Sequence, residues 1–208
     1  MIEKFKTIAQ PGEAEFFEKN SRFIGYAYPV EGEEAAQAYL SDLRRLHVKA
    51  AHNCFAYQIG MNNEFIRQSD DGEPSGTAGL PILDVIQKQG LRNVLVVVTR
   101  YFGGILLGAG GLVRAYSRAA KEAVAAAGII EPVLHQKFQI AVPYTLGGKL
   151  EHEIRLQNYI LVDTAYAEEV SFTLLTPAQN AEALIKHLTN LTNAKAVIIP
   201  AEQLYYSP

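Results

Sequence analysis

Apolar residues fill every position from Val94 to Val98. Such an uninterrupted run of branched side chains predicts a strand that is buried on both faces. Five glycines then fall within the nine positions from Gly103 to Gly111, which indicates backbone conformations that side chains would forbid. The apolar residues that follow recur at helical spacing and predict an amphipathic helix. Its apolar face contains Leu112, Tyr116, Ala119 and Ala123.

Alternating polarity and turn residues predict the elements before this region. They are two short strands or a hairpin around Pro11-Gly12 (3–9 and 14–19), a strand (21–30), a helix (33–47), a strand (52–59), a polar loop (68–79) and a short helix between Pro81 and Gly90. After the glycine-rich region the pattern is β-α-β-β-α-β. Its members are strands at 136–142, 159–166, 169–175 and 194–201 and helices at 144–156 and 177–191. This order predicts a ferredoxin-like domain.

The pattern therefore predicts an α+β protein of two domains, residues 1–135 and 136–208. The length of 208 residues allows each domain its own core. A net charge of −3 argues against a strongly basic nucleic-acid-binding protein, so any such binding must be local. The single cysteine, Cys54, excludes an internal disulfide, and the N-terminus lacks the apolar core of a signal peptide. We expect a cytoplasmic protein with no membrane contact.

Basic side chains lie opposite the apolar face of the helix that follows the glycines. At 100° per residue, Arg114, Arg118 and Lys121 form one stripe. The unpaired amides at the start of that helix attract anions. The candidate anion or nucleic-acid site comprises Arg100, Tyr101, Phe102, Gly103, Gly104, Gly108, Gly110, Gly111, Arg114 and Arg118. Alternatively, the glycines permit a close strand-to-helix crossing, the basic stripe is a solvated face and the aromatic residues belong to the core. Neither nucleotide-binding glycine fingerprint is complete.

The polar loop at 68–79 is a second candidate ligand site. Asp70, Asp71 and Glu73 could hold Mg²⁺, although turn and cap acceptors are the favoured interpretation, and Ser75 and Thr77 lie in the same loop. In the strand at 52–59, the His52-x-Cys54 pair provides too few ligands for zinc, so a packed histidine and a buried thiol are favoured. No metal and no cofactor are predicted.

Three stretches resemble one known family. They are DDGEPSGTAG at 70–79, RYFGGI-x-LG-x-GGL-x-RAY at 100–116 and His52-x-Cys54-x-Ala56-Tyr57, and together they resemble the IMPACT/YigZ family. The resemblance covers essentially the whole chain. It implies a mixed α/β two-layer N-terminal domain like a small-subunit ribosomal protein and the fourth domain of elongation factor G. It also implies a smaller C-terminal domain like the fifth domain of that factor. Eukaryotic members are translational regulators, and no established enzymatic activity comes with the family.

Our leading hypothesis is a non-enzymatic cytoplasmic protein that binds RNA or the ribosome and has a translation-related regulatory role. Arginines and backbone amides would meet phosphates, and aromatic side chains would stack on unpaired bases. One alternative is an enzyme that uses Mg²⁺ on a phosphorylated small molecule, which requires the acidic and glycine-rich loops to converge. Another is a protein–protein interaction module built on the second domain. Sequence-specific DNA binding is not expected.

Overall fold

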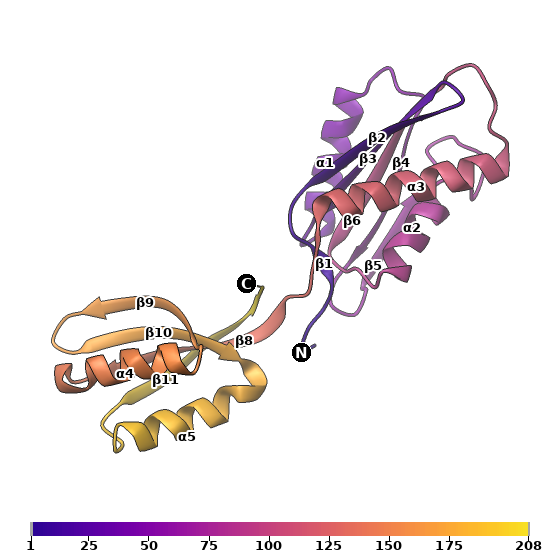
Figure 1. Ribbon diagram of the computed structural model, residues 1–208. Coiled ribbons are helices and arrows are strands. Elements are labelled where there is room, and N and C mark those ends of the chain that lie inside the picture. Colours follow the sequence, from indigo (N-terminus) through magenta and orange to yellow (C-terminus); the bar gives the residue numbers. More distant parts are fainter. Residues whose placement is uncertain (1, 208) are drawn as a thin grey trace. The chain divides into compact units, whose positions relative to one another are not determined.

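The computed structural model describes residues 2–207, which form two compact units (Figure 1). The first unit is Phe5–Glu131. The second contains the chain from Pro132 onward together with the N-terminal residues up to Lys4. Within the second unit, the amide of Leu134 donates to the carbonyl of Glu3 over 2.8 Å, which joins the N-terminal residues to it. No helix among the described residues is long and apolar enough to cross a membrane.

The first unit is built on an antiparallel five-stranded sheet with the order β2-β3-β6-β4-β5. The strands are β2 (Gly12–Glu18), β3 (Ser21–Pro29), β4 (His52–Ile59), β5 (Phe65–Ser69) and β6 (Val94–Tyr101), and the helices are α1 (Glu33–Leu46), α2 (Gly79–Lys88) and α3 (Ala109–Ala127). The predicted strand at 94–98 is thus the central strand. Two short strands, β1 (Thr7–Ile8) and β7 (Ile129–Ile130), pair with each other, so the first strand does not form the predicted hairpin around Pro11-Gly12.

Helices cover both faces of this sheet (Figure 1). Val96 and Val98 face the core beneath α2 and α3, whereas Leu95 and Val97 face the core beneath α1. All four side chains are fully buried, as the apolar run predicts. A strand buried on both faces needs cover on both, because each unshielded apolar face would stay in water. The unit therefore has three layers, and the expectation of two layers was wrong.

Helix α3 packs closely on the edge of the sheet. A Cβ atom on Gly25 would lie 2.4 Å from the carbonyl oxygen of Ala119, and one on Gly12 would lie 2.3 Å from the amide nitrogen of Ala127. Only glycine allows the helix backbone to approach β2 and β3 this closely. The predicted apolar face of α3 is buried against the sheet, so the opposite face is turned to solvent.

The second unit has the β-α-β-β-α-β order that the sequence predicts. Its elements are β8 (Val133–Val142), α4 (Tyr144–Leu156), β9 (Ile160–Tyr166), β10 (Val170–Pro177), α5 (Ala181–Leu191), which follows a 3-10 turn at 178–180, and β11 (Val197–Tyr206). The sheet order β11-β8-β10-β9 is antiparallel throughout and ferredoxin-like. The core between sheet and helices centres on Phe138, Phe172 and Leu188.

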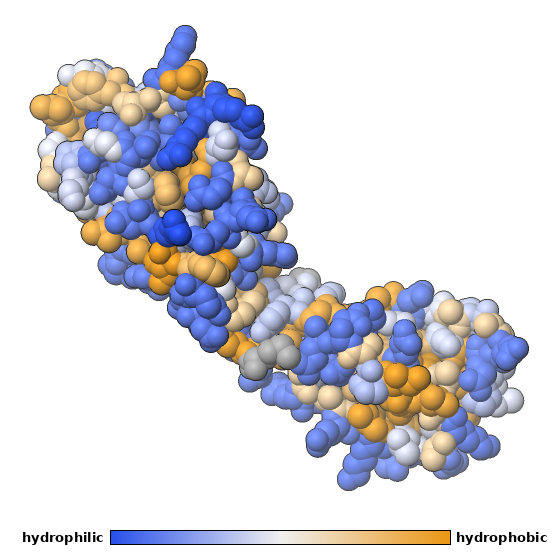
Figure 2. Space-filling view, turned by 180° about the vertical axis from the view of Figure 1, so that it is seen from behind, coloured by the Kyte–Doolittle hydropathy of each residue, from blue (hydrophilic) through white to orange (hydrophobic). Residues whose placement is uncertain are grey.

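The sheet of the second unit keeps apolar side chains on its outer face. Val197 and Ile199 are each about half exposed, and hydrophobic residues are visible on the surface of this unit in Figure 2. Lys137 projects from β8 and pairs with Glu202 over 2.8 Å. Glu202 therefore neutralises the positive charge of Lys137 on the outer face of this sheet.

Candidate nucleic-acid interface

The site begins with a row of side chains across the sheet of the first unit. Phe16 of β2 is paired with Phe23 of β3. On the central strand β6, Arg100 is paired with Phe23 on one side and with His52 of β4 on the other. Arg100 continues the alternation of Val96 and Val98, so it lies on the face that α2 and α3 cover. The charge of Arg100 therefore enters a largely apolar layer.

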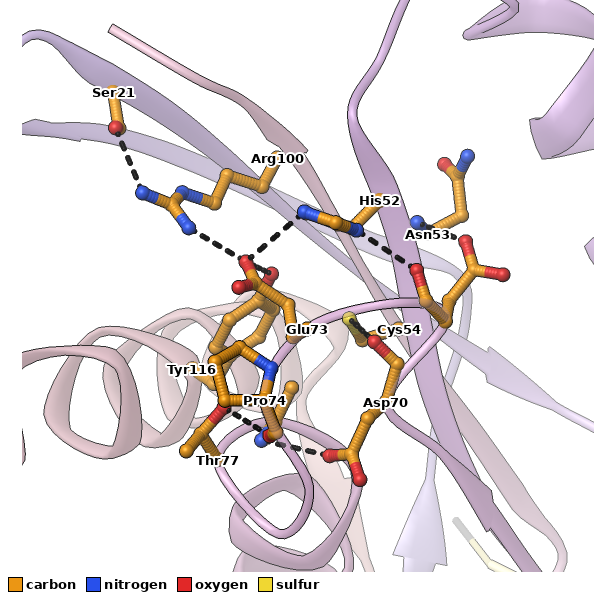
Figure 3. Close-up of polar contacts among 12 residues, drawn as sticks. Ser21, His52, Asn53, Cys54, Asp70, Glu73, Pro74, Thr77, Arg100 and Tyr116 are labelled. Atoms are coloured by element: carbon orange, nitrogen blue, oxygen red, sulfur yellow. Dashed lines mark hydrogen bonds and ion pairs between the residues drawn. The ribbon is translucent and has the colours of Figure 1, made fainter. Parts of the chain in front are cut away.

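A buried ion pair compensates this charge (Figure 3). The Nη1 atom of Arg100 lies 2.6 Å from Oε1 of Glu73, and the two side chains are only 5% and 3% exposed. The hydroxyl of Tyr116 on α3 donates to the same carboxylate oxygen over 2.7 Å. Nη2 of Arg100 donates to Oγ of Ser21 over 3.2 Å. The Glu73 carboxylate thus ties the loop after β5 to β6 and α3, and Arg100 extends the network to Ser21 of β3, which gives the pair a structural role.

The His52-x-Cys54 pair lies beside this network and is packed, as the sequence interpretation favoured. Nδ1 of His52 lies 2.8 Å from the carbonyl oxygen of Asp71. The thiol of Cys54 donates to the carbonyl oxygen of Asp70 over 2.9 Å. Burial raises the pKa of this thiol to about 12, so the thiolate that metal binding and nucleophilic attack both require is scarce at neutral pH.

The acidic residues of the 68–79 loop have separate partners. Asp70 accepts hydrogen bonds from the amides of Gly76, Ala78 and Gly79 over 2.8–3.0 Å, at the start of α2. Its burial raises its pKa, but these amides outweigh that effect and the net pKa is lowered. Asp71 accepts from the amide of Asn53 over 2.6 Å. In residues 2–207 no group of three potential ligands is placed to hold a metal ion.

Ser75 and Thr77, the other two candidate residues of this loop, do not converge on a common ligand site. The hydroxyl of Thr77 donates to the carbonyl oxygen of Pro74 over 2.7 Å, which is a local turn contact. Ser75 is exposed. Only Glu73 reaches the segment that contains the glycine-rich loop, and it does so through the buried pair with Arg100. Among the three carboxylates, Asp70 therefore acts as a turn and cap acceptor, whereas Asp71 accepts from a strand amide and Glu73 forms the buried ion pair.

The exposed face of α3 borders a pocket of about 240 Å³. The pocket lies between α3 and the turn at the end of β2. Lys19, Arg114 and Arg118 provide its positive charge, Glu18 is the acidic residue in its wall, and the remaining lining residues are Phe16, Leu107, Gly111 and Ala115.

The three cations of the pocket are paired to different degrees. Arg118 donates to Glu122 over 2.7 Å and lies 4.1 Å from the centre of the Phe16 ring. Within the described part of the chain, neither Arg114 nor Lys19 has an ion pair or side-chain hydrogen bond, and both are exposed. Two unpaired cations beside a concave surface can bind an anion with little rearrangement.

The glycine-rich segment connects β6 to this pocket. An added Cβ on Gly103 would lie 2.0 Å from the backbone of Asn20, so the chain passes the β2–β3 turn in close contact. Gly104 and Gly108 have φ values of +84° and +74°, which other residues rarely adopt. No side chain caps the start of α3. Gly110 and Gly111 lie in its first turn, where backbone amides face outward along the helix.

The structure brings together only part of the predicted basic site. Gly111, Arg114 and Arg118 line the pocket. Arg100 does not, because it is buried against Glu73, and its assignment as a phosphate ligand was wrong. Tyr101 points to the opposite face of the sheet, where its hydroxyl lies 2.9 Å from Nδ1 of His47. Lys121 is exposed further along α3.

Sequence reasoning missed Lys19. Its position is fixed by the tight turn between β2 and β3, in which Lys19 and Asn20 both have positive φ. The sequence Lys19-Asn20 between two alternating segments indicates such a turn. Its proximity to α3 depends on sheet pairing that local sequence does not reveal.

These features define an α+β protein of two domains with a buried structural ion pair and a basic pocket beside a glycine-rich loop. A family model described as the Impact N-terminal domain matches residues 19–124, and one described as a domain of unknown function, DUF1949, matches residues 140–195. The IMPACT family member YvyE of Bacillus subtilis is 40% identical over 205 residues, which cover 99% of this chain and 94% of YvyE. The chain therefore belongs to the IMPACT family, as the sequence motifs indicate.

A solved structure and a eukaryotic protein are also similar to this chain. A solved structure titled "Crystal structure of an hypothetical protein" is 28% identical, has a TM-score of 0.63 and covers 97% of this chain and 99% of its own. Protein IMPACT of Oryctolagus cuniculus is 38% identical over 96 residues, which cover 44% of this chain and 30% of that protein. The similarity to the rabbit protein is thus confined to a segment shorter than the first unit.

Proposed function

We propose that this chain is a non-enzymatic cytoplasmic protein that binds RNA or the ribosome and has a translation-related regulatory role. The observation that supports RNA binding is the pocket at α3, where neither Lys19 nor Arg114 forms an ion pair among the described residues. Phosphate groups are the anions that such exposed cations meet on RNA. The regulatory role rests on membership of the IMPACT family, whose eukaryotic members the sequence resemblance identifies as translational regulators.

The position of the positive charge explains how a chain with a net charge of −3 can bind a polyanion. Charge concentrated on one concave surface raises the local potential, although the molecule as a whole is acidic. Some of the other basic residues on α3 and α1 are paired within their helices. Arg118 with Glu122 and Arg45 with Asp42 are examples. Arg44 of α1 lies 3.8 Å from Asp71. Binding is therefore expected at this pocket and not over the whole surface.

A salt titration tests this proposal. The full-length protein is titrated into a fluorescent single-stranded RNA and into ribosomal subunits over a range of salt concentrations. Affinity should fall as salt rises, because bound cations release counterions from phosphate. The Arg114→Ala and Lys19→Ala variants should bind more weakly and should each reduce the slope of log K against log salt by about one unit or slightly less.

Arg45→Ala is the matched control, because Arg45 is an exposed arginine of the same unit that lies on α1, across the sheet from the pocket. Its affinity and salt slope should equal those of the wild type. If wild-type protein binds neither RNA nor ribosomal subunits at low salt, or if Arg45→Ala weakens binding as much as Arg114→Ala, the proposal is refuted.

A further inference from the structure

We propose that the ligand of this surface is single-stranded RNA, in which one unpaired base stacks on the ring of Phe102 while a neighbouring phosphate occupies the basic pocket. This inference rests on the proposed function and adds the form of the RNA and the residue that selects it. The buried Arg100–Glu73 pair then also contributes to binding, because it holds the aromatic side chain in position. Arg100 is the positioning residue for Phe102 and does not itself contact the ligand.

The Phe102 ring is half exposed. The guanidinium of Arg100 lies 5.4 Å from its centre and, at the same distance, from the centre of the Phe23 ring. Glu73 and Ser21 hold that guanidinium in place. Because this cation–π contact is made in the buried layer, the exposed part of the ring is available to a flat ligand.

The backbone beside Phe102 is also fixed. The amide of Gly103 donates to Oγ of Ser21 over 3.2 Å, the same hydroxyl that accepts from Arg100. The close approach of Gly103 to Asn20 leaves no room for the chain to shift toward the β2–β3 turn. A stacking residue held in advance loses little conformational entropy on binding. Phe102 is therefore a prepared platform and differs from Leu106 of the same loop, whose side chain is 80% exposed.

The register of the sheet sets the distance between Phe102 and the pocket. Glu18, in the pocket wall, is paired with Ser21 on β3. Arg22 is paired with Tyr101, so Phe102 follows at the position beside Ser21. Two strand spacings of about 4.8 Å then separate Glu18 from Phe102, or roughly 10 Å. Adjacent nucleotides of one extended strand can reach both places.

The combination of cations and an open aromatic ring favours a single strand over a duplex. Bases in a duplex are stacked on their neighbours, so a duplex offers this surface only its phosphates. An unpaired base can stack on Phe102 whatever its identity, because every base has a π face. We therefore expect recognition of unpaired RNA with little dependence on sequence.

The experiment uses a short single-stranded RNA with one 2-aminopurine, titrated with the full-length protein. The fluorescence of 2-aminopurine should fall on binding, because stacking on an aromatic ring quenches it. Phe102→Ala should abolish this quenching and weaken binding between about fivefold and a hundredfold. Phe102→Tyr should retain both properties, since it keeps the ring. Leu106→Ala is the matched control and should behave as the wild type.

A duplex of the same length separates this inference from the proposed function. Arg114→Ala should weaken binding of both RNAs, whereas Phe102→Ala should affect only the single strand. If Arg114→Ala weakens binding but Phe102→Ala leaves the affinity and the quenching of the single strand unchanged, the stacking inference fails and the phosphate-binding function stands. If polyglutamate displaces the single strand as well as unlabelled RNA does, the surface recognises acidic chains in general and the inference also fails. Absence of any RNA binding by the wild type overturns both proposals.

Phe102→Leu distinguishes loss of the aromatic ring from loss of folding as the cause of weaker binding. It keeps an apolar side chain of similar size over Arg100 and lacks a π system. Circular dichroism should show the wild-type spectrum, and the variant should bind the single strand as weakly as Phe102→Ala. Wild-type quenching and affinity in Phe102→Leu would overturn the proposed stacking.

Discussion

Arg100 and Arg114 belong to the same stretch of sequence, residues 100–116, but meet opposite environments in the same unit. Arg100 ends a buried strand and forms an ion pair with Glu73 at 5% exposure. Arg114 lies on the outer face of α3 with no partner among the described residues. Charge alone therefore does not identify a residue that contacts a ligand. A paired, buried arginine organises the fold, whereas an unpaired, exposed one can bind an anion.

The contrast between the two arginines separates the site into a region that stabilises the fold and a region that binds the ligand. The buried region consists of Glu73, Arg100 and Tyr116 and connects the 68–79 loop to β6 and α3. The exposed region consists of Lys19, Arg114 and Arg118 and borders the pocket. If the division is right, substitutions in the buried region should reduce stability, and those in the exposed region should reduce binding.

The largest effect is expected for Arg100→Met. The substitution removes the guanidinium and leaves the Glu73 carboxylate buried without its cation, so the free energy of unfolding should fall by about 3–5 kcal/mol. Urea denaturation followed by circular dichroism measures this loss. The double variant Glu73→Gln/Arg100→Met should lose less than the sum of the two single losses, because no uncompensated charge remains. A loss below about 1 kcal/mol in Arg100→Met would mean that the pair behaves as a surface ion pair.

Tyr116→Phe should have the next largest effect. It removes one hydrogen bond to a buried carboxylate and leaves the ring in place, so we expect a loss of about 1.5–3 kcal/mol of unfolding free energy. Burial raises the pKa of Tyr116 far above its usual range, so the hydroxyl keeps its proton and the effect should be constant from pH 6 to pH 9. Tyr144→Phe is the control, because Tyr144 is 56% exposed. Equal losses in the two variants would contradict the special role of the buried hydroxyl.

Much of the fold could be predicted from the sequence because its signals are local. The run at 94–98 predicted a strand buried on both faces, and the helix predicted at 144–156 has those bounds in the structure. Periodicity also placed the buried and exposed faces of α3 correctly. The three-layer arrangement follows from the same run, since a strand buried on both faces needs a layer of cover on each face.

The candidate site was less predictable because its partners are distant in sequence. Arg100 shares the alternation of Val96 and Val98, which was a local signal for burial. Its partner Glu73 lies 27 residues away, and no local pattern connects the two. Lys19 reaches the pocket only because β2 and α3 are neighbours in the folded unit. Pairings of this kind depend on the tertiary arrangement and not on propensity or periodicity.

Asp70→Asn tests a third environment, in which backbone amides and no basic side chain hold the carboxylate. Burial raises the pKa of Asp70, but the hydrogen bonds from the amides of Gly76, Ala78 and Gly79 outweigh this effect and hold the pKa below its usual value. A lowered pKa in the folded state means that the charge stabilises the fold above the unfolded pKa, and that this contribution disappears as pH falls through the folded value. At pH 7 the variant should lose about 1 kcal/mol of unfolding free energy. The difference from the wild type should shrink below pH 4, and a difference that grows there would refute this account.

Arg114→Ala should have the smallest effect on stability and therefore gives the sharpest test of the comparison. Arg114 has no partner to lose, and its removal relieves repulsion with Lys19 and Arg118, so the free energy of unfolding should change by no more than about 0.5 kcal/mol. Urea denaturation of this variant beside Arg100→Met measures both arginines on one scale. A large loss in Arg114→Ala would show that its side chain supports the fold, and the separation into a structural arginine and a binding arginine would be lost. An unchanged stability together with weakened RNA binding would show that Arg114 binds RNA without supporting the fold, in contrast to Arg100.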